Sequence, residues 1–313
     1  MPTETLSREA MQLVSRLRFR HLQLMTELQR GGSLRAAAQV LNLTQPALSK
    51  ALGEIESAFG FALFTRTARG LTPTARGEVA IRGAALLLRE LAHVREEAAS
   101  GDGGAAILRI GAPPFVAQGY LPKVLLALAR RDPQVRVQLL EERVPLLMQA
   151  LVAGEVDALV TTYPARMPEA GTVSLVYEKL FDAGFLVLAP PAHPLARARQ
   201  VDWQRLAREP WIMPAPSSMV RRVIEDAFMR AGVVPPVPLV ESTSPVTNVQ
   251  LIAAGIGIGA APESTARHAI SLGQVKRVRV KPEIAPGPVA LIYRAGGDNP
   301  RVALLKAALT ANA

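Results

Sequence analysis

The sequence predicts a helical N-terminal third followed by an α/β C-terminal two thirds. Apolar residues recur at helical spacing through the first hundred residues. From about residue 106 onward, short apolar runs typical of buried strands alternate with helical runs, which favours a largely parallel sheet. A glycine-rich segment at 100–104 separates the two parts, and 313 residues suffice for two or three domains.

The composition is that of a soluble globular protein, with 49% hydrophobic residues but only 4% aromatic ones. Cysteine is absent, which excludes disulfides, thiolate chemistry and Cys-ligated zinc. Charges interrupt every apolar run near the start, and no run is long enough to span a bilayer, so we expect a cytoplasmic protein. The four histidines lack metal-ligand spacing, and no catalytic constellation is present. We therefore expect no metal, no cofactor and no enzymatic activity.

The charge is strongly basic, with 36 Lys and Arg against 26 Asp and Glu and a net charge of +10. Such a balance favours a polyanionic partner, either nucleic acid or an anionic membrane surface. Between Arg16 and Arg76 there are nine basic and three acidic residues, so six of the ten net charges lie in this segment. This concentration favours nucleic acid over an ordinary solvated surface.

Three short helices are predicted at 19–29, 33–41 and 45–59. The separators between them carry helix stop and start signals, with Ser33 and Thr44 as N-caps. Two helices joined by a turn of about three or four residues form a helix-turn-helix.

The start of the third of these helices exposes Gln45, Pro46, Ser49 and Lys50. In a helix that enters a major groove, Gln pairs with adenine, while Ser and Lys reach base edges or phosphates. Thr44 places a hydroxyl beside the helix N-terminus, where a phosphate is bound favourably.

Residues 60–74 contain β-formers, two arginines and a glycine, which predicts a short two-stranded wing. Arg66 and Arg69 would enter a minor groove or grip the backbone there. Thr74 then opens a long helical pattern with apolar residues near a 3.5-residue period, which predicts a dimerisation seam. Its members are Ile81, Ala84, Leu88 and Leu91.

The run GSLRAAAQVLNLTQPALSKALGEIESAFGFALFTRTARGLTPTARG resembles the DNA-binding signature of LysR-type transcriptional regulators. The resemblance implies a winged helix-turn-helix at 17–75 and a linker helix at 74–100. It also implies double-stranded promoter DNA as partner, dimers that assemble to tetramers, and contact with RNA polymerase. The expected DNA-binding residues are Ser33, Arg35, Thr44, Gln45, Pro46, Ser49, Lys50, Arg66 and Arg69.

The remainder resembles the effector domain of the same family more weakly, through runs such as LVAGEVDALVTT and LIAAGIGIGAAPES. The family resemblance implies two Rossmann-like α/β subdomains of the periplasmic-binding-protein type II kind, with a small-molecule effector between them. We expect the chain to cross between the subdomains near 165 and 293. Subdomain I would then comprise 106–165 and 293–313, and subdomain II 166–292.

Effector contacts are expected in loops at the cleft, where helix N-termini and hydroxyls offer directional bonds. Many relatives carry a hydroxyl where this sequence has a Pro-Pro pair, which lacks N–H donors, so a carboxylate effector is less favoured at that loop. The aromatic ring of Phe115 either contacts an apolar part of the ligand or packs in the core. The matching positions are Pro113, Pro114, Phe115, Thr161, Thr162, Ser217, Ser218, Met219, Thr243, Ser244 and Thr247.

The hypothesis is therefore a transcriptional regulator whose DNA binding responds to a small molecule. One alternative is a solute-binding or enzymatic α/β protein whose basic N-terminal segment is incidental. Another is an architectural DNA-binding protein that has no ligand.

Overall fold

The structure is a computed structural model that describes residues 7–67, 70–99, 107–162, 173–216, 218–296 and 299–310. The chain divides into an N-terminal unit, which extends to residue 105 and includes 153–155, and a C-terminal unit formed by the other residues. The glycine-rich segment at 100–104, expected as the domain boundary, lies outside the described residues. None of the described helices has the length and apolar content needed to cross a membrane.

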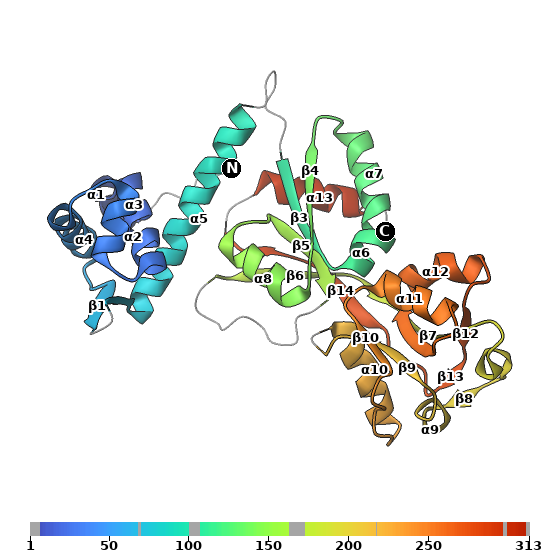
Figure 1. The fold of residues 1–313 in the computed structure, drawn as a ribbon. Helices are drawn as coiled ribbons and strands as arrows, with labels where there is room; N and C mark the ends of the chain where they lie inside the picture. The colour runs from blue at the N-terminus through green and yellow to red at the C-terminus, as the bar shows by residue number, and fades with distance from the viewer. Residues whose placement is uncertain are drawn as a thin grey trace. The chain divides into compact units, whose positions relative to one another are not determined.

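The N-terminal unit is helical, with one small hairpin (Figure 1). The predicted helix-turn-helix, wing and linker helix are confirmed, and a further short helix, α1, precedes them. The elements are α1 (Arg8–Arg16), α2 (Phe19–Gly31), α3 (Leu34–Leu41), α4 (Gln45–Phe59), β1 (Phe64–Thr67), β2 (Gly70–Pro73) and α5 (Ala75–Ala98).

Hydroxyl side chains cap α3 and α4 in this unit. Ser33 Oγ accepts the N–H of Ala36 at 3.2 Å, and Thr44 Oγ1 accepts that of Ala47 at 3.4 Å. Both caps agree with the sequence expectation, because these oxygens satisfy N–H groups that lack a partner within the helix. Asn42 adopts the left-handed conformation with φ 52°, which ends α3 and turns the chain toward α4.

The core of the N-terminal unit lies around α2, which packs against α3, α4 and α5. The small side chains of Ala37 and Ala38 on α3 let the helices approach closely. The remaining buried members come from α2, α4, the hairpin and α5: Leu22, Leu24, Met25, Leu28, Leu48, Leu52, Ile55, Leu63, Phe64, Ile81 and Ala84.

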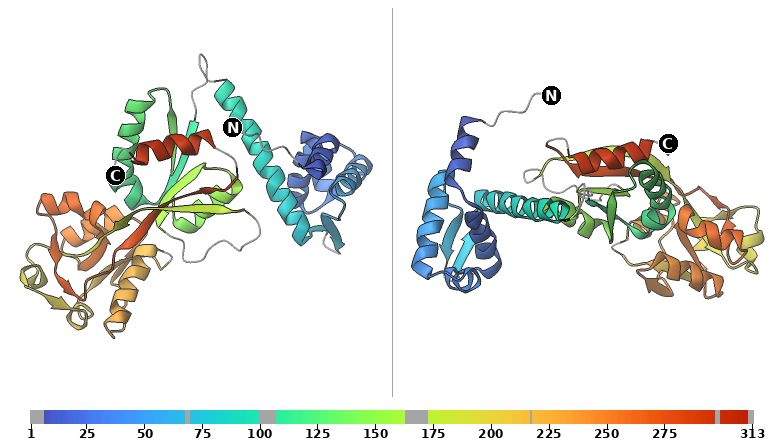
Figure 2. Two further views of the ribbon diagram at one scale, coloured as in Figure 1. Left: turned by 180° about the vertical axis from the view of Figure 1, so that it is seen from behind. Right: turned by 90° about the horizontal axis from the view of Figure 1, so that it is seen from above.

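The first α/β subdomain contains a five-stranded sheet in the order β4-β3-β5-β14-β6. Helices α6, α7 and α13 cover one face and α8 covers the other (Figure 2). The elements are β3 (Ile107–Ala112), α6 (Pro114–Gly119), α7 (Leu121–Arg131), β4 (Arg136–Glu141), α8 (Val144–Ala153), β5 (Ala158–Thr162), β6 (Leu175–Ala183), β14 (Gly287–Arg294) and α13 (Pro300–Thr310).

Two ion pairs, one of them buried, fasten the last helix to this sheet. Asp157, which is 2% exposed, accepts the backbone N–H of Arg109 at 2.8 Å and pairs with Arg301 of α13 at 3.4 Å. Lys306 of α13 lies 2.6 Å from the carboxylate of Glu178 on β6. The C-terminal helix is therefore part of the first subdomain.

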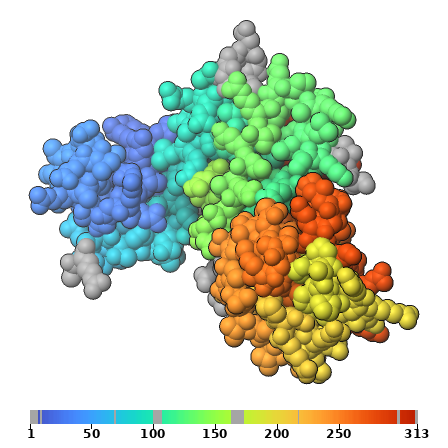
Figure 3. All heavy atoms as spheres, turned by 45° about the vertical axis from the view of Figure 1, so that its right-hand side comes forward, coloured from blue at the N-terminus to red at the C-terminus, as the bar shows by residue number. Residues whose placement is uncertain are grey.

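The second subdomain contains a sheet in the order β10-β9-β11-β7-β12, with α10 on one face and α11 and α12 on the other. Its atoms form a continuous yellow and orange body in the space-filling view (Figure 3). The elements are β7 (Phe185–Ala189), η1 (Pro194–Arg197), β8 (Val201–Asp202), α9 (Trp203–Leu206), β9 (Trp211–Pro214), α10 (Met219–Arg230), β10 (Val240–Ser242), α11 (Pro245–Ala253), β11 (Ile258–Pro262), α12 (Glu263–Ser271), β12 (Lys276–Val278) and β13 (Val280–Lys281).

The strand pairing corrects two expectations. Each five-stranded sheet has three neighbouring parallel strands, but β14, β6, β7 and β12 pair antiparallel to their neighbours, so both sheets are mixed. In addition, β6 and β14 belong to the first sheet, although most of their residues were expected in subdomain II at 166–292. The strands therefore change sheet between 183 and 185 and between 281 and 287, rather than near 165 and 293.

The wing meets the linker helix at a contact that only glycine permits. Thr74 Oγ1 accepts the N–H of Gly77 at 2.9 Å and donates to the carbonyl of Ala62 at 2.9 Å. A Cβ at Gly77 would collide with the carbonyl oxygen of Leu63. The T-x-x-G pattern at the start of α5 therefore combines a helix cap with a close backbone approach.

We predict that Gly77→Ala destabilises the N-terminal unit by more than about 2 kcal/mol, because backbone must move to admit the methyl group. Gly53→Ala is the matched control, since Gly53 lies within α4 and a Cβ there meets nothing within 4 Å. It should stabilise the unit by roughly 0.5–1 kcal/mol. Hydrogen exchange should accelerate in α2 and α5 of Gly77→Ala alone, and equal protection in the two variants would contradict the assignment.

Candidate functional site

The first turn of α4 presents polar side chains to solvent while the helix is held from behind. Leu48, Leu52 and Ile55 are buried in the core of the N-terminal unit. Gln45 and Lys50 are exposed, as the sequence predicts. Pro46 occupies the first turn, where its missing N–H breaks no helix hydrogen bond. The N-terminal end of α4 therefore offers side chains and free N–H groups to a ligand in front of it.

The other predicted contacts in the helix-turn-helix differ in their exposure. Arg35 is exposed on the first turn of α3, and Ser49 is half-buried on α4. The oxygens of Ser33 and Thr44 accept their own helix caps, so each hydroxyl keeps a hydrogen to donate to a phosphate. A capping hydroxyl and a phosphate contact are therefore compatible.

The wing is an antiparallel hairpin in which Arg66 on β1 stands opposite Leu71 on β2. Arg66 is exposed, while Phe64 at the start of the strand is buried. The N–H of Leu71 donates to the carbonyl of Gly32 at 2.8 Å, which ties the wing to the turn between α2 and α3. Arg69 lies outside the described residues.

Glu56 connects the wing to α4, and the sequence analysis did not identify it. Its Oε1 accepts the N–H groups of Leu63 at 2.7 Å and Phe64 at 3.1 Å. A carboxylate that accepts two backbone N–H groups holds the hairpin in a fixed position on the helix. The only signal in the sequence was an acidic residue inside a basic segment, which by itself is more typical of a solvated surface.

The predicted seam on α5 needs correction. Ile81 and Ala84 are buried in the core of their own chain, and Leu88 packs against that core, so only Leu91 of the four is exposed. The exposed apolar residues of α5 instead recur at spacings of three, four and eight residues: Val79, Leu87, Leu91 and Val94. The 3.5-residue period selected the apolar stripe that faces the core of the same chain. The sequence alone does not show which apolar stripe of α5 that core covers and which it leaves exposed.

The predicted effector positions lie where parallel strands end. Pro113 and Pro114 follow β3, the two threonines end β5, and the segments 215–219 and 243–247 follow β9 and β10. Within each sheet these strands are parallel, so their carboxyl ends share an edge. Ligands of open α/β sheets bind outside such edges.

The side chains at these positions differ in what they can offer. Thr161 and Thr162 are buried, and within the described residues neither hydroxyl has a hydrogen-bond partner. Ser218 begins α10 without a side-chain cap, whereas Ser244 caps α11 by accepting the N–H of Thr247 at 3.2 Å. Thr243 and Thr247 are exposed, and Ser217 lies outside the described residues.

Two apolar candidates have structural partners. Phe115 is 6% exposed and packs in the core of the first subdomain, which supports core packing over a ligand contact as the role of its ring. Met219 is half-buried and packs against the cores of both subdomains. Asn248 on α11 was not predicted as a contact, and its buried Oδ1 also has no partner among the described residues. In the same ranges, no three His, Asp or Glu residues gather as a metal site.

We predict that Glu56→Ala loosens the wing, because the N–H groups of Leu63 and Phe64 lose their acceptor at a cost of about 1–3 kcal/mol. Glu56→Gln keeps one acceptor oxygen and should give a smaller loss. Faster hydrogen exchange at 63 and 64, together with weaker duplex binding, is the expected result. Unchanged exchange in Glu56→Ala would refute the connecting role.

Comparisons with known proteins place this architecture in a family. The model for the bacterial regulatory helix-turn-helix protein, lysR family, matches residues 19–78, and that for the LysR substrate binding domain matches residues 101–313. The HTH-type transcriptional regulator GbpR of Azospirillum brasilense is 31% identical over 247 residues, covering 77% of this chain and 70% of that protein. GalR of Pseudomonas putida is 28% identical over 281 residues, covering 88% and 69%.

Solved structures share the fold at low sequence identity. A full-length single-residue variant of OxyR from Pseudomonas aeruginosa is 24% identical with a TM-score of 0.62, covering 94% of each chain. Full-length BenM is 22% identical with a TM-score of 0.58, covering 95% of this chain and 96% of that one. The family models together cover the helix-turn-helix and both α/β subdomains, and the second model alone matches more than half of the chain. The chain therefore belongs to the LysR family of transcriptional regulators, with a DNA-binding helix-turn-helix domain followed by an α/β effector-binding domain.

Proposed function

We propose that this regulator reads operator DNA with Gln45, Pro46, Ser49 and Lys50 in a major groove. Phosphates or an adjacent minor groove are contacted by Arg35, Arg66 of the wing and Arg69. The hydroxyls of Ser33 and Thr44 donate hydrogen bonds to phosphate oxygens. The observation that carries the proposal is the exposed first turn of α4 above a buried Leu48, Leu52 and Ile55. A helix supported in this way can enter a groove without leaving the core of its domain.

The dimer that we propose is formed through α5. Its exposed stripe contains Val79, Leu87, Leu91 and Val94, all at least 45% exposed, and such a stripe is stabilised when a second helix covers it. Two-fold pairing presents two reading helices to a palindromic site, and two dimers associate through their effector domains into a tetramer. The assembly acts on promoters in the cytoplasm, contacts RNA polymerase and performs no catalysis.

The effector that we propose binds at the strand ends of both sheets. Thr161, Thr162, Ser218 and Ser244 offer hydroxyls there, with Pro113, Pro114, Met219, Thr243, Thr247 and Ser217 in the adjoining segments. One structural neighbour is a CcmR regulatory domain from Synechocystis in complex with 2-PG, with 20% identity and a TM-score of 0.58. Because this chain has no cysteine, its response does not use thiol oxidation. Ligand binding instead shifts the population of effector-domain conformations and thereby the spacing of the reading helices.

We predict that Gln45→Ala costs about 1–3 kcal/mol at one base position and relaxes specificity there. Arg66→Ala should weaken binding to all duplexes and flatten the salt dependence, because it removes a contact to the backbone. The measurement is fluorescence anisotropy with operator variants at several salt concentrations, after footprinting has located the site. Uniform losses of equal size in both variants would refute the division of roles, and no protected palindrome upstream of any gene would refute operator binding.

We predict that Thr161→Val and Thr162→Val affect ligand binding unequally. Neighbouring residues of a strand face opposite sides, so only one of the two hydroxyls can face a given ligand. Neither substitution should reduce stability, because each removes a buried hydroxyl without a described partner. The measurement is thermal denaturation against a metabolite panel, where a ligand at one hundred times its dissociation constant stabilises by about 2.7 kcal/mol. A wild-type protein that responds to no metabolite would favour a ligand-independent DNA-binding protein instead.

A further inference from the structure

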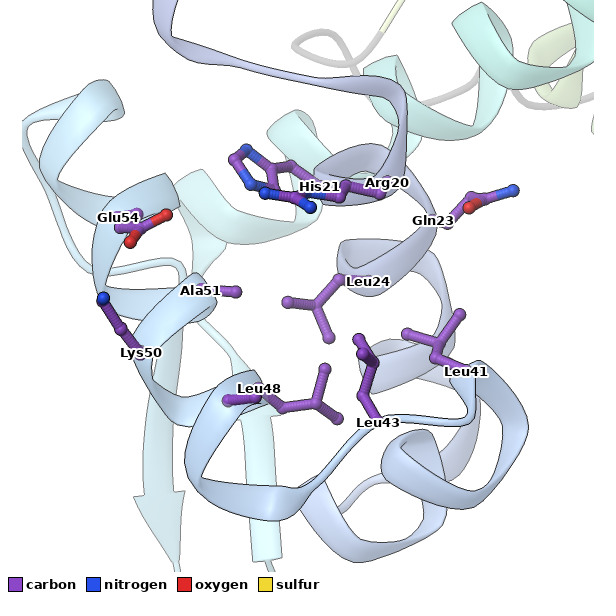
Figure 4. Close-up of a pocket in the computed structure, with 11 residues that line it drawn as sticks. Arg20, His21, Gln23, Leu24, Leu41, Leu43, Leu48, Lys50, Ala51 and Glu54 are labelled. Atoms are coloured by element: carbon purple, nitrogen blue, oxygen red, sulfur yellow. The ribbon is translucent and has the colours of Figure 1, made fainter.

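A pocket of about 340 Å³ lies in the DNA-binding domain, between α2, the end of α3 and the first half of α4 (Figure 4). Ligand pockets in proteins have volumes of roughly 300–1,000 Å³, so a small organic molecule fits here. The pocket belongs entirely to the N-terminal unit and is separate from the strand ends where the effector is proposed to bind. Its lining residues are Arg20, His21, Gln23, Leu24, Leu41, Leu43, Ala47, Leu48, Lys50, Ala51 and Glu54.

The lining is divided into an apolar end and a polar end. Four leucines from α2, α3, the following turn and α4 gather at one end: Leu24, Leu41, Leu43 and Leu48 (Figure 4). Arg20 and His21 lie at the other end, with Lys50 and Glu54 at the side formed by α4. A molecule with an apolar body and one polar group matches this division.

His21 is the clearest sign of a missing partner. Its side chain is 4% exposed, and within the described part of the chain neither ring nitrogen has a hydrogen-bond partner. Buried polar groups are normally paired, and a neutral imidazole offers one N–H donor and one acceptor. Burial is the main cause that lowers the pKa of His21, Arg20 and Arg18 lower it further, and Glu54 raises it. The surrounding cations outnumber the single acid, which favours an anion.

We propose that this pocket binds a small amphipathic carboxylate, with its apolar body against the leucines and its carboxylate at His21, Arg20 and Lys50. The regulator then has a second small-molecule site, located inside its DNA-binding domain. One consequence rests on the proposed DNA contact of Lys50: a carboxylate that engages its ammonium group competes with DNA for that side chain.

The test uses the full-length protein with ¹³C-labelled histidine and benzoate as the probe. Four histidines give few imidazole signals, and His21→Phe identifies the one at the pocket. Benzoate should move the His21 signal with half-saturation near roughly 1 mM, the strength expected of so small a ligand. Benzyl alcohol and benzylamine share its ring without the negative charge and should bind at least about tenfold more weakly, the loss expected without a charge-assisted hydrogen bond.

Pocket variants separate this site from any other benzoate site on the protein. Ala51→Leu fills the pocket on a helix position that leucine suits, and should abolish the response of the His21 signal. Ala58→Leu adds the same volume on the same helix outside the lining, and should leave it unchanged. An anion also favours the protonated imidazole, so benzoate should raise the lowered pKa of His21. It should therefore bind more tightly at about pH 5.5 than at about pH 7.5.

Two results would overturn the proposal: a His21 signal that benzoate does not move, or one that all three probes move equally. DNA binding is measured separately, by the fluorescence anisotropy of a labelled duplex with and without benzoate, for the wild type and for Ala51→Leu. Weaker DNA binding in wild type alone supports competition for Lys50. A pocket that binds benzoate without affecting DNA binding refutes the competition for Lys50 and leaves the ligand site established.

Discussion

The packing of one face of α4 in the core is the constraint on which the proposed DNA-binding surface depends. Leu48, Leu52 and Ile55 hold one face of the helix in the core, while Gln45 at the start of the helix and Lys50 stay exposed. A glutamate near the end of the same helix accepts two N–H groups at the start of the wing. A single helix therefore positions both the side chains proposed to face a groove and the hairpin beside it. Any change that rotates α4 would move both together.

The same helix also forms one side of the pocket that contains His21. Ala47 and Ala51 lie on this side, between the side chains proposed to contact bases and those buried in the core. Small residues at these positions leave space that larger ones would fill. In the described chain, the DNA-binding domain therefore also has a pocket suited to a ligand. A ligand bound there would act on the DNA-binding surface within the same domain.

Local features of the fold and of the candidate site were predictable, because they depend on residues close in sequence. The caps Ser33 and Thr44 and the exposed first turn of α4 followed from short-range patterns and the family resemblance. The periodicity of α5 showed an apolar face but not which element covers it, and Ile81 is covered by its own domain. The place of β6 and β14 in the first sheet depends on pairing between distant segments. Likewise, Glu56 acts through a neighbouring hairpin, and no local pattern encodes that contact.

The hydrogen bond between Leu71 and Gly32 links the wing to the helix-turn-helix through main-chain atoms alone. Gly70, beside it, lies so close to the Gly32 carbonyl that a side chain would not fit. At this point the spacing between the wing and the helix-turn-helix is thus fixed by a backbone contact, which does not depend on the side chains proposed to face the duplex. Exchange of those side chains would leave this contact in place.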